Sequence, residues 1–186
     1  MEDLIQRIRD HYVEQFRGFV QAQCREFDTG VGEVKIRLNG EGLSNRLYCI
    51  DFLANIDGET VLRELQPDLI LTFDPLTGSI GQADLEVLGL KWDDVILEHD
   101  LKADVEGLAD WFDVWFDPED KRHDPAAELS LCIHSLSVEP GRLCVDFGTA
   151  PPDAFWELMK VLLDAGVTQI RISYTQGSVQ GEAAGD

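Results

Sequence analysis

Basic residues are scarce in this chain. Its 186 residues include 15 Lys and Arg against 36 Asp and Glu, which gives a formal net charge of −21 at pH 7. A surface with this charge repels nucleic-acid phosphates and anionic membrane headgroups. We therefore expect no direct binding to nucleic acid and no binding to membranes.

Long apolar runs and targeting signals are also missing. No run approaches the length of about 20 apolar residues that a membrane-spanning helix needs. The first residues, Met1-Glu2-Asp3, lack the basic start and the apolar stretch of a signal peptide. These two absences favour a cytoplasmic location.

The four cysteines contain no CxxC pair. Cys24, Cys49, Cys132 and Cys144 are scattered, and each lies within an apolar pattern. Such cysteines are typically reduced and partly buried, and their spacing supports neither a zinc site nor a disulfide. We therefore expect four reduced, half-buried thiols.

Motifs that identify a reaction or a cofactor are absent. The sequence contains neither nucleotide-binding glycine pattern, GxGxxG or GxxxxGK[ST], and it has no HExxH, EF-hand or GxSxG motif. Glu98-His99-Asp100 offers three ligand types, but adjacent side chains rarely converge on one ion. The acids Asp113, Asp117, Glu119 and Asp120 do not match a calcium-binding spacing. We therefore expect no metal, no cofactor and no catalytic residue.

Apolar residues are plentiful enough for a folded core. They make up 44% of the chain, which includes four tryptophans, so the charge does not indicate general disorder. A chain of this length can bury roughly 70% of the surface that it exposes when unfolded. We expect residues 1–175 to form a single domain and residues 176–186 to form a mobile polar tail.

The hydrophobic periodicity indicates an α+β fold. We expect an N-terminal helix, a mainly antiparallel sheet of about five to seven strands, an acidic central helix and a C-terminal ββαβ segment. The predicted helices cover 4–27, 101–117 and 152–163, and the predicted strands cover 33–38, 46–56, 60–65, 69–73, 129–138, 143–147 and 167–174. Residues 75–100 are hard to interpret, although 83–88 favours a turn or two of helix.

Acidic residues are concentrated in the middle of the chain. Between Glu64 and Glu128 there are 18 acidic and 4 basic residues, so this third supplies −14 of the net charge of −21. In the predicted central helix, a projection at 100° per residue places Glu106, Asp110, Asp113 and Asp117 on one side. Like charges at this spacing destabilise a helix by about 0.2 to 0.5 kcal/mol per pair.

This acidic stripe has two interpretations. It is either a solvated face or a surface for a basic protein partner, with Trp111 and Val114 adding apolar contact area and Glu119 and Asp120 extending the charge. In size and charge the chain resembles the small acidic cytoplasmic immunity proteins that neutralise basic nuclease toxins, although no motif is shared. We favour a non-catalytic, immunity-protein-like role in protein binding.

Two alternatives come from other functional classes. The first is a small enzyme whose site lies between sheet and helices and uses His99 or His134. If Pro140 and Gly141 form the turn of a hairpin, His134 lies opposite Phe147 and Leu136 opposite Val145, which favours a half-buried histidine in apolar surroundings. The second is a structural or oligomeric assembly protein, which a measured solution mass would distinguish.

Overall fold

The computed structural model describes residues 1–27, 29–38, 47–56, 58–68, 70–122, 124 and 126–175. The described chain forms an α+β fold, as expected, but its strands form two sheets, of three and six strands, rather than a single sheet. The helices are α1 (Glu2–Glu26), α2 (Leu108–Phe116) and α3 (Pro152–Asp164). The strands are β1 (Gly30–Arg37), β2 (Leu47–Ile56), β3 (Glu59–Arg63), β4 (Leu76–Ile80), β5 (Ala83–Val87), β6 (Val95–His99), β7 (Ser135–Glu139), β8 (Arg142–Asp146) and β9 (Gln169–Ser173).

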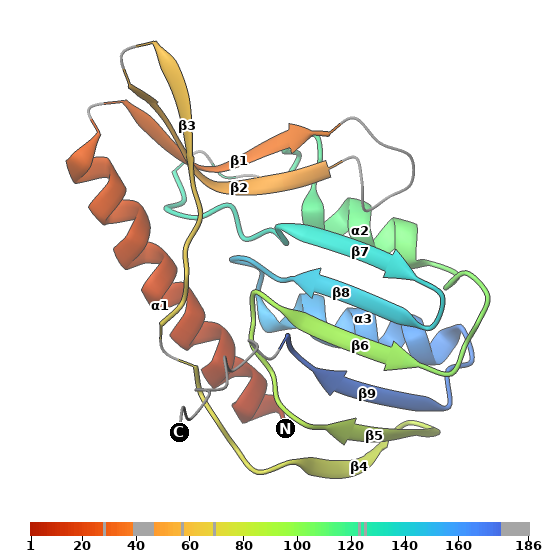
Figure 1. The fold of residues 1–186 in the computed structure, drawn as a ribbon. Coiled ribbons are helices and arrows are strands. Elements are labelled where there is room, and N and C mark those ends of the chain that lie inside the picture. Colours follow the sequence, from red (N-terminus) through yellow and green to blue (C-terminus); the bar gives the residue numbers. More distant parts are fainter. Residues whose placement is uncertain are drawn as a thin grey trace, which may run out of the picture.

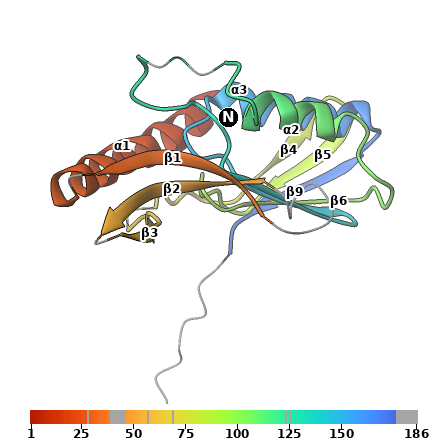
Figure 2. The same ribbon diagram turned by 90° about the horizontal axis from the view of Figure 1, so that it is seen from above.

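The larger sheet has six strands in the order β4-β5-β9-β6-β8-β7. All its neighbours are antiparallel except β5 and β9, which are parallel. Helices α2 and α3 lie together on one face of this sheet (Figures 1 and 2). Buried and exposed residues alternate along β5 and β9 because successive side chains of a strand point to opposite faces.

The smaller sheet has the order β1-β2-β3 and packs on the C-terminal half of α1 (Figure 1). Helix α1 carries acidic residues in its first turn and Arg25 in its last turn, where each sign of charge suits the helix dipole. Its apolar stripe is buried and consists of Ile5, Ile8, Tyr12, Val13 and Phe16. Because α1 contacts both α3 and the smaller sheet, it connects the two halves of the fold.

The two sheets meet where β2 approaches the segment that leads into β7. The backbone N–H of Cys49 donates to the carbonyl of His134 at 2.8 Å, and the N–H of His134 donates to the carbonyl of Asp146 at 2.9 Å. His134 therefore lies at the junction of the sheets, bonded through its backbone to β2 on one side and to β8 on the other.

The C-terminal ββαβ prediction is confirmed by β7, β8, α3 and β9. Leu136 pairs with Val145 as predicted, and Gly141 occupies the hairpin turn with a φ of 76°, a conformation that glycine adopts without steric cost. The strand predicted at 129–138 is shorter than expected, because regular pairing begins only at Ser135.

Several predicted elements were wrong. Residues 83–88 favoured helix, but 83–87 form strand β5, because the alternating burial of β5 between β4 and β9 overrides local preference. The described residues from 70 to 73 form no strand. The central helix begins at Leu108 rather than near residue 101, after Gly107 with a φ of 82°. The tail predicted at 176–186 lies outside the described residues.

None of the described helices combines the length and the apolar character that crossing a membrane requires.

Candidate functional site

The outer surface of α2 carries exposed carboxylates. Asp110 and Asp113 project from the helix, Glu106 lies in the turn just before it, and Val114, one turn after Asp110, is 46% exposed. No basic side chain of the described residues forms an ion pair with Glu106, Asp110 or Asp113. We refer to Glu106, Asp110, Asp113 and Val114 as the acidic surface.

Trp111 is not exposed beside this surface, contrary to our expectation. Its ring is 4% exposed, and its indole N–H donates to the carbonyl of Ala154 in α3 at 3.0 Å. Trp115 likewise donates to the Glu157 carboxylate of α3 at 2.8 Å. Because α2 packs on both the six-stranded sheet and α3, more of its circumference is buried than the predicted apolar stripe, and the buried part includes Trp111.

Asp117 is also placed differently from the prediction. It is 8% exposed and adopts a left-handed conformation with a φ of 50° at the end of α2. Its carboxylate accepts hydrogen bonds from the backbone N–H groups of Lys121 at 3.0 Å and Arg122 at 2.7 Å. The side chain thus stabilises the loop after α2 and is not part of an exposed stripe.

Glu119 and Asp120 are exposed but already have cationic partners. Glu119 pairs with Lys121 at 2.7 Å, and Asp120 pairs with Lys35 at 2.6 Å. Their charges are therefore partly compensated within the chain, unlike those of Glu106, Asp110 and Asp113.

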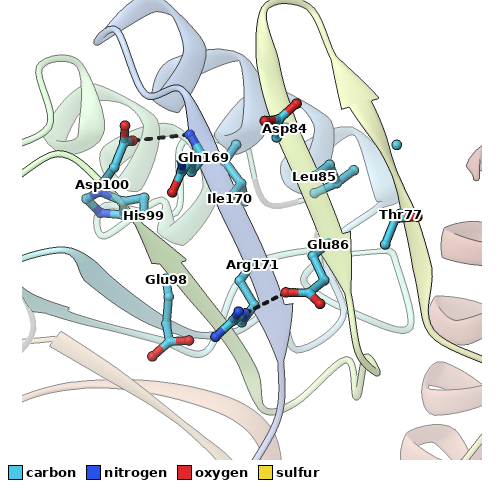
Figure 3. Close-up of a pocket in the computed structure, with 11 residues that line it drawn as sticks. Thr77, Asp84, Leu85, Glu86, Glu98, His99, Asp100, Gln169, Ile170 and Arg171 are labelled. Atoms are coloured by element: carbon cyan, nitrogen blue, oxygen red, sulfur yellow. Dashed lines mark hydrogen bonds and ion pairs between the residues drawn. The ribbon is translucent and has the colours of Figure 1, made fainter.

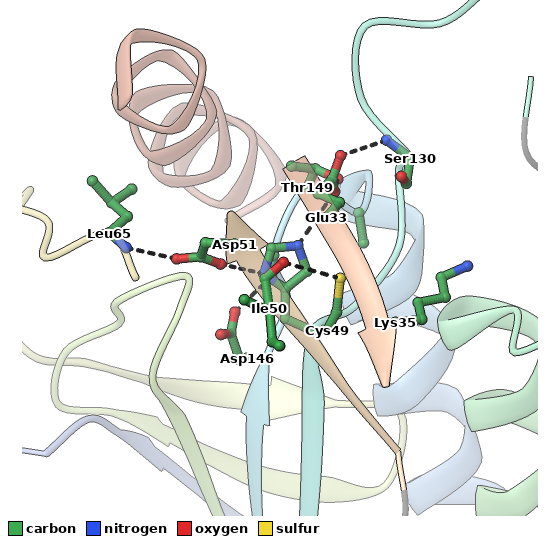
Figure 4. Close-up of polar contacts among 12 residues, drawn as sticks. Glu33, Lys35, Cys49, Ile50, Asp51, Leu65, Ser130, Asp146 and Thr149 are labelled. Carbon is green, nitrogen blue, oxygen red and sulfur yellow. Dashed lines mark hydrogen bonds and ion pairs between the residues drawn. The ribbon is translucent and has the colours of Figure 1, made fainter. Parts of the chain in front are cut away.

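A second cluster of polar residues is buried at the junction of the sheets (Figure 4). In the β1·β2 register, Gly32 pairs with Phe52 and Val34 with Ile50, so Glu33 lies opposite Asp51. Glu33 has a φ of 51°, a left-handed conformation that is unusual for this residue type within a strand. Its side chain is 4% exposed, and that of Asp51 is 7% exposed.

The two carboxylates are bridged by His134, which is fully buried. Its Nδ1 lies 2.9 Å from Asp51 Oδ1, and its Nε2 lies 3.3 Å from Glu33 Oε1. Glu33 also accepts hydrogen bonds from the Thr149 hydroxyl and from the N–H of Ser130. The expectation of a half-buried histidine in apolar surroundings was wrong, because His134 is fully buried and β1 and β2 bring two acids to its ring from a distant part of the sequence.

The contacts set the protonation of this cluster. Burial lowers the pKa of His134, but the hydrogen bonds to Asp51 and Glu33 outweigh it and raise the pKa well above its usual value. Burial would raise the pKa of Glu33, yet His134, Thr149 and Ser130 together lower it. For the half-buried Asp146, burial raises the pKa to about 7. An imidazolium between two carboxylates is therefore the arrangement that these contacts favour.

Two buried thiols complete the cluster. Cys49 and Cys132 are 0% and 2% exposed, and their sulfur atoms lie within 4.8 Å of each other and of a ring nitrogen of His134. The hydrogen bond between the thiols raises the pKa of Cys49 and lowers that of Cys132. All four cysteines are free, as expected, but only Cys144 is half-buried, because Cys24 is exposed and Cys49 and Cys132 are buried.

The other histidine that we considered, His99, borders an open groove of about 670 Å³ across β4, β5, β9 and β6 (Figure 3). Burial lowers the pKa of His99. No described carboxylate lies within hydrogen-bonding distance of its ring. Three charged residues that line this groove have partners other than His99: Arg171 pairs with Glu86 at 2.7 Å, and Asp100 accepts hydrogen bonds from Thr168 and Gln169.

Comparisons with protein-family models, with curated proteins and with solved structures found no match to this chain. A function therefore has to come from the geometry of the chain's own residues.

Proposed function

We propose that this protein is a non-catalytic binding module that engages a basic protein partner through its acidic surface. The observation that carries this proposal is that Glu106, Asp110 and Asp113 are exposed and lack a cationic partner among the described residues, while Val114 offers exposed apolar area beside Asp110. Lysine and arginine side chains of a partner would supply the missing countercharge.

The surroundings add to the same charge. Helix α3 packs beside α2 and exposes Asp153 and Glu157, so the negative surface extends beyond α2. Clustered charge of one sign raises the association rate of an oppositely charged partner and makes binding depend on salt. A stoichiometric neutraliser of a basic toxin, similar in character to an immunity protein, is one form that such a module takes.

The enzyme alternative has less support. A catalytic histidine would need a pocket for substrate together with a carboxylate within hydrogen-bonding reach. His134 has two carboxylates but is fully buried, whereas His99 borders a groove but has no described carboxylate at its ring. Neither histidine meets both conditions.

The test compares three proteins as bait at low salt. The first is the wild type, and the second carries Glu106→Gln, Asp110→Asn and Asp113→Asn. The third is a matched control with Glu14→Gln, Glu59→Gln and Asp74→Asn, which replaces three exposed acids elsewhere and changes the net charge equally. Proteins that salt elutes from the wild type are identified, and the affinity of each basic candidate is measured for all three baits.

We expect the triple change in the acidic surface to weaken binding of the cognate partner by about tenfold or more and to reduce its salt dependence. The control should bind nearly as tightly as the wild type. Equal affinity of all three baits for the partner would refute the proposal.

A further inference from the structure

We infer that Cys49, Cys132 and His134 form a binding site for a structural zinc ion at the junction of the two sheets. One donor atom from each of these residues lies within 4.8 Å of the other two. Zinc bonds to sulfur at about 2.3 Å and to imidazole nitrogen at about 2.0 Å, which places the ligands of a tetrahedral site about 3.5 to 3.8 Å apart. Small side-chain shifts would therefore close these donors around one ion.

The donor types favour zinc. Two thiolates and one imidazole select a borderline-soft ion with tetrahedral preference, whereas calcium and magnesium prefer sets of oxygen ligands. The site is also closed to solvent, because all three side chains are at most 2% exposed. A buried site of this kind is typical of structural zinc rather than of catalytic zinc, which keeps a position open to water.

The hydrogen bonds around His134 assign its two nitrogens. Nδ1 lies 2.9 Å from Asp51, which is the arrangement in which a carboxylate orients a histidine that ligates a metal through its other nitrogen. Nε2 is therefore the nitrogen for the ion. Glu33 Oε1 lies 3.3 Å from Nε2, but it is not among the donor atoms that all lie within 4.8 Å of one another, so the three ligands are Cys49, Cys132 and His134.

The backbone supports this assignment independently. Glu33 combines its left-handed conformation with a buried carboxylate that contacts His134. Strain of this type persists where the surrounding structure requires it, and it often marks a functional site. A small pocket of about 90 Å³ has Cys132, Trp115 and Leu129 among its lining residues.

The experiment uses the tag-free full-length chain, reduced and stripped of metal with a chelator. Zn²⁺ or Co²⁺ is added, excess ion is removed by gel filtration, and the retained metal is counted by mass spectrometry. We expect one ion per chain. We also expect the Co²⁺ form to show thiolate-to-metal charge-transfer absorption and tetrahedral d–d bands.

Variants separate this site from adventitious binding. Cys49→Ser and Cys132→Ser should each lose at least tenfold in metal affinity and lose charge-transfer intensity. The double variant Cys24→Ser/Cys144→Ser, which keeps only the two buried thiols, should retain the full spectrum. This second variant preserves the test if the buried substitutions prevent folding. A wild type that retains no metal would overturn the inference, as would a Cys24→Ser/Cys144→Ser variant without charge-transfer absorption.

Discussion

His134 Nδ1 lies 2.9 Å from Asp51 Oδ1 across the junction between the two sheets. Residue 51 belongs to β2 and residue 134 precedes β7, so this contact joins segments that are far apart in the sequence. Beside this contact, the backbone N–H of Cys49 donates a hydrogen bond to the backbone carbonyl of His134. Polar contacts therefore attach the three-stranded sheet to the larger sheet. The contact between the His134 ring and the Asp51 carboxylate is strengthened by the burial of both side chains.

Gly148 should tolerate no side chain because it lies against the His134 ring. A Cβ atom there would be 2.1 Å from His134 Cδ2, and the φ is 47°. Gly166 is the matched control, because its φ of 89° is also left-handed but a Cβ atom would meet nothing within 4 Å. Urea unfolding should show a loss of about 1 to 2 kcal/mol for Gly166→Ala and a larger loss for Gly148→Ala. Equal losses would mean that the ring can move aside without cost.

The charge of Asp113 should oppose the stability of α2. It lies in the second half of this helix, where the dipole disfavours an acid, whereas Asp153 lies in the first turn of α3, where the dipole favours one. Asp113→Asn should raise the free energy of unfolding by about 0.3 to 1 kcal/mol, and Asp153→Asn should lower it by a similar amount. Both differences should shrink in high salt. Changes of the same sign would contradict this interpretation.

Asp117 should matter more for stability than its exposed neighbour Asp120. Asp117→Asn replaces one of the two oxygens that accept N–H groups of the loop, so it should cost about 1 to 3 kcal/mol. Asp120→Asn weakens an ion pair with Lys35 in which the carboxylate is 60% exposed, and it should cost about 1 kcal/mol or less. Thermal or urea unfolding measures both, and a larger loss for Asp120→Asn would refute the assigned roles.

Asp100 should contribute to stability against acid. Hydrogen bonds from the Thr168 hydroxyl and from the N–H groups of Thr168 and Gln169 lower its pKa to about 2. Because the folded-state pKa lies below the usual value of about 3.9, the contribution is complete above about pH 4 and is lost as the pH falls toward 2.

The measurement is the difference in unfolding free energy between wild type and Asp100→Asn across this pH range. The difference should be constant near neutral pH and should shrink below about pH 4. Asp84→Asn serves as a control, because Asp84 is exposed on the same sheet and its carboxylate makes no hydrogen bond with the described residues. An Asp100→Asn difference that does not change with pH would contradict the role of these hydrogen bonds.

Much of the fold could be predicted because local patterns and packing agree there. The apolar stripe at helical spacing predicts α1, and the Pro140-Gly141 turn predicts the hairpin of β7 and β8. Strand β5 could not be predicted, since its five residues pair with β9 from the far end of the chain. The exposure of Trp111 was predicted wrongly. A helical projection gives the direction of each side chain around α2, but it does not show that α3 covers the side of α2 that carries Trp111.

The buried cluster was missed for a related reason. Glu33 alternates with the apolar residues of its strand, which favours an exposed side chain, but this face of β1 is covered where Ser130, His134 and Thr149 contact Glu33. The sequence does give a sign that Asp51 has a special role. Asp51 is a charged residue inside the apolar run from Tyr48 to Ala54, and a buried charge needs a partner. Nothing in the sequence identifies His134 as that partner, because the pairing depends on how the two sheets meet.

The charged bridge at His134 is tested most directly by a mutant cycle in metal-free protein, measured as the free energy of unfolding. His134→Leu leaves Glu33 and Asp51 buried without a cation and should cost about 3 to 5 kcal/mol. Adding Glu33→Gln and Asp51→Asn to that variant should cost little more or restore stability, so the triple variant loses far less than the sum of the separate losses. Losses that simply add would show that the histidine and the two carboxylates act independently.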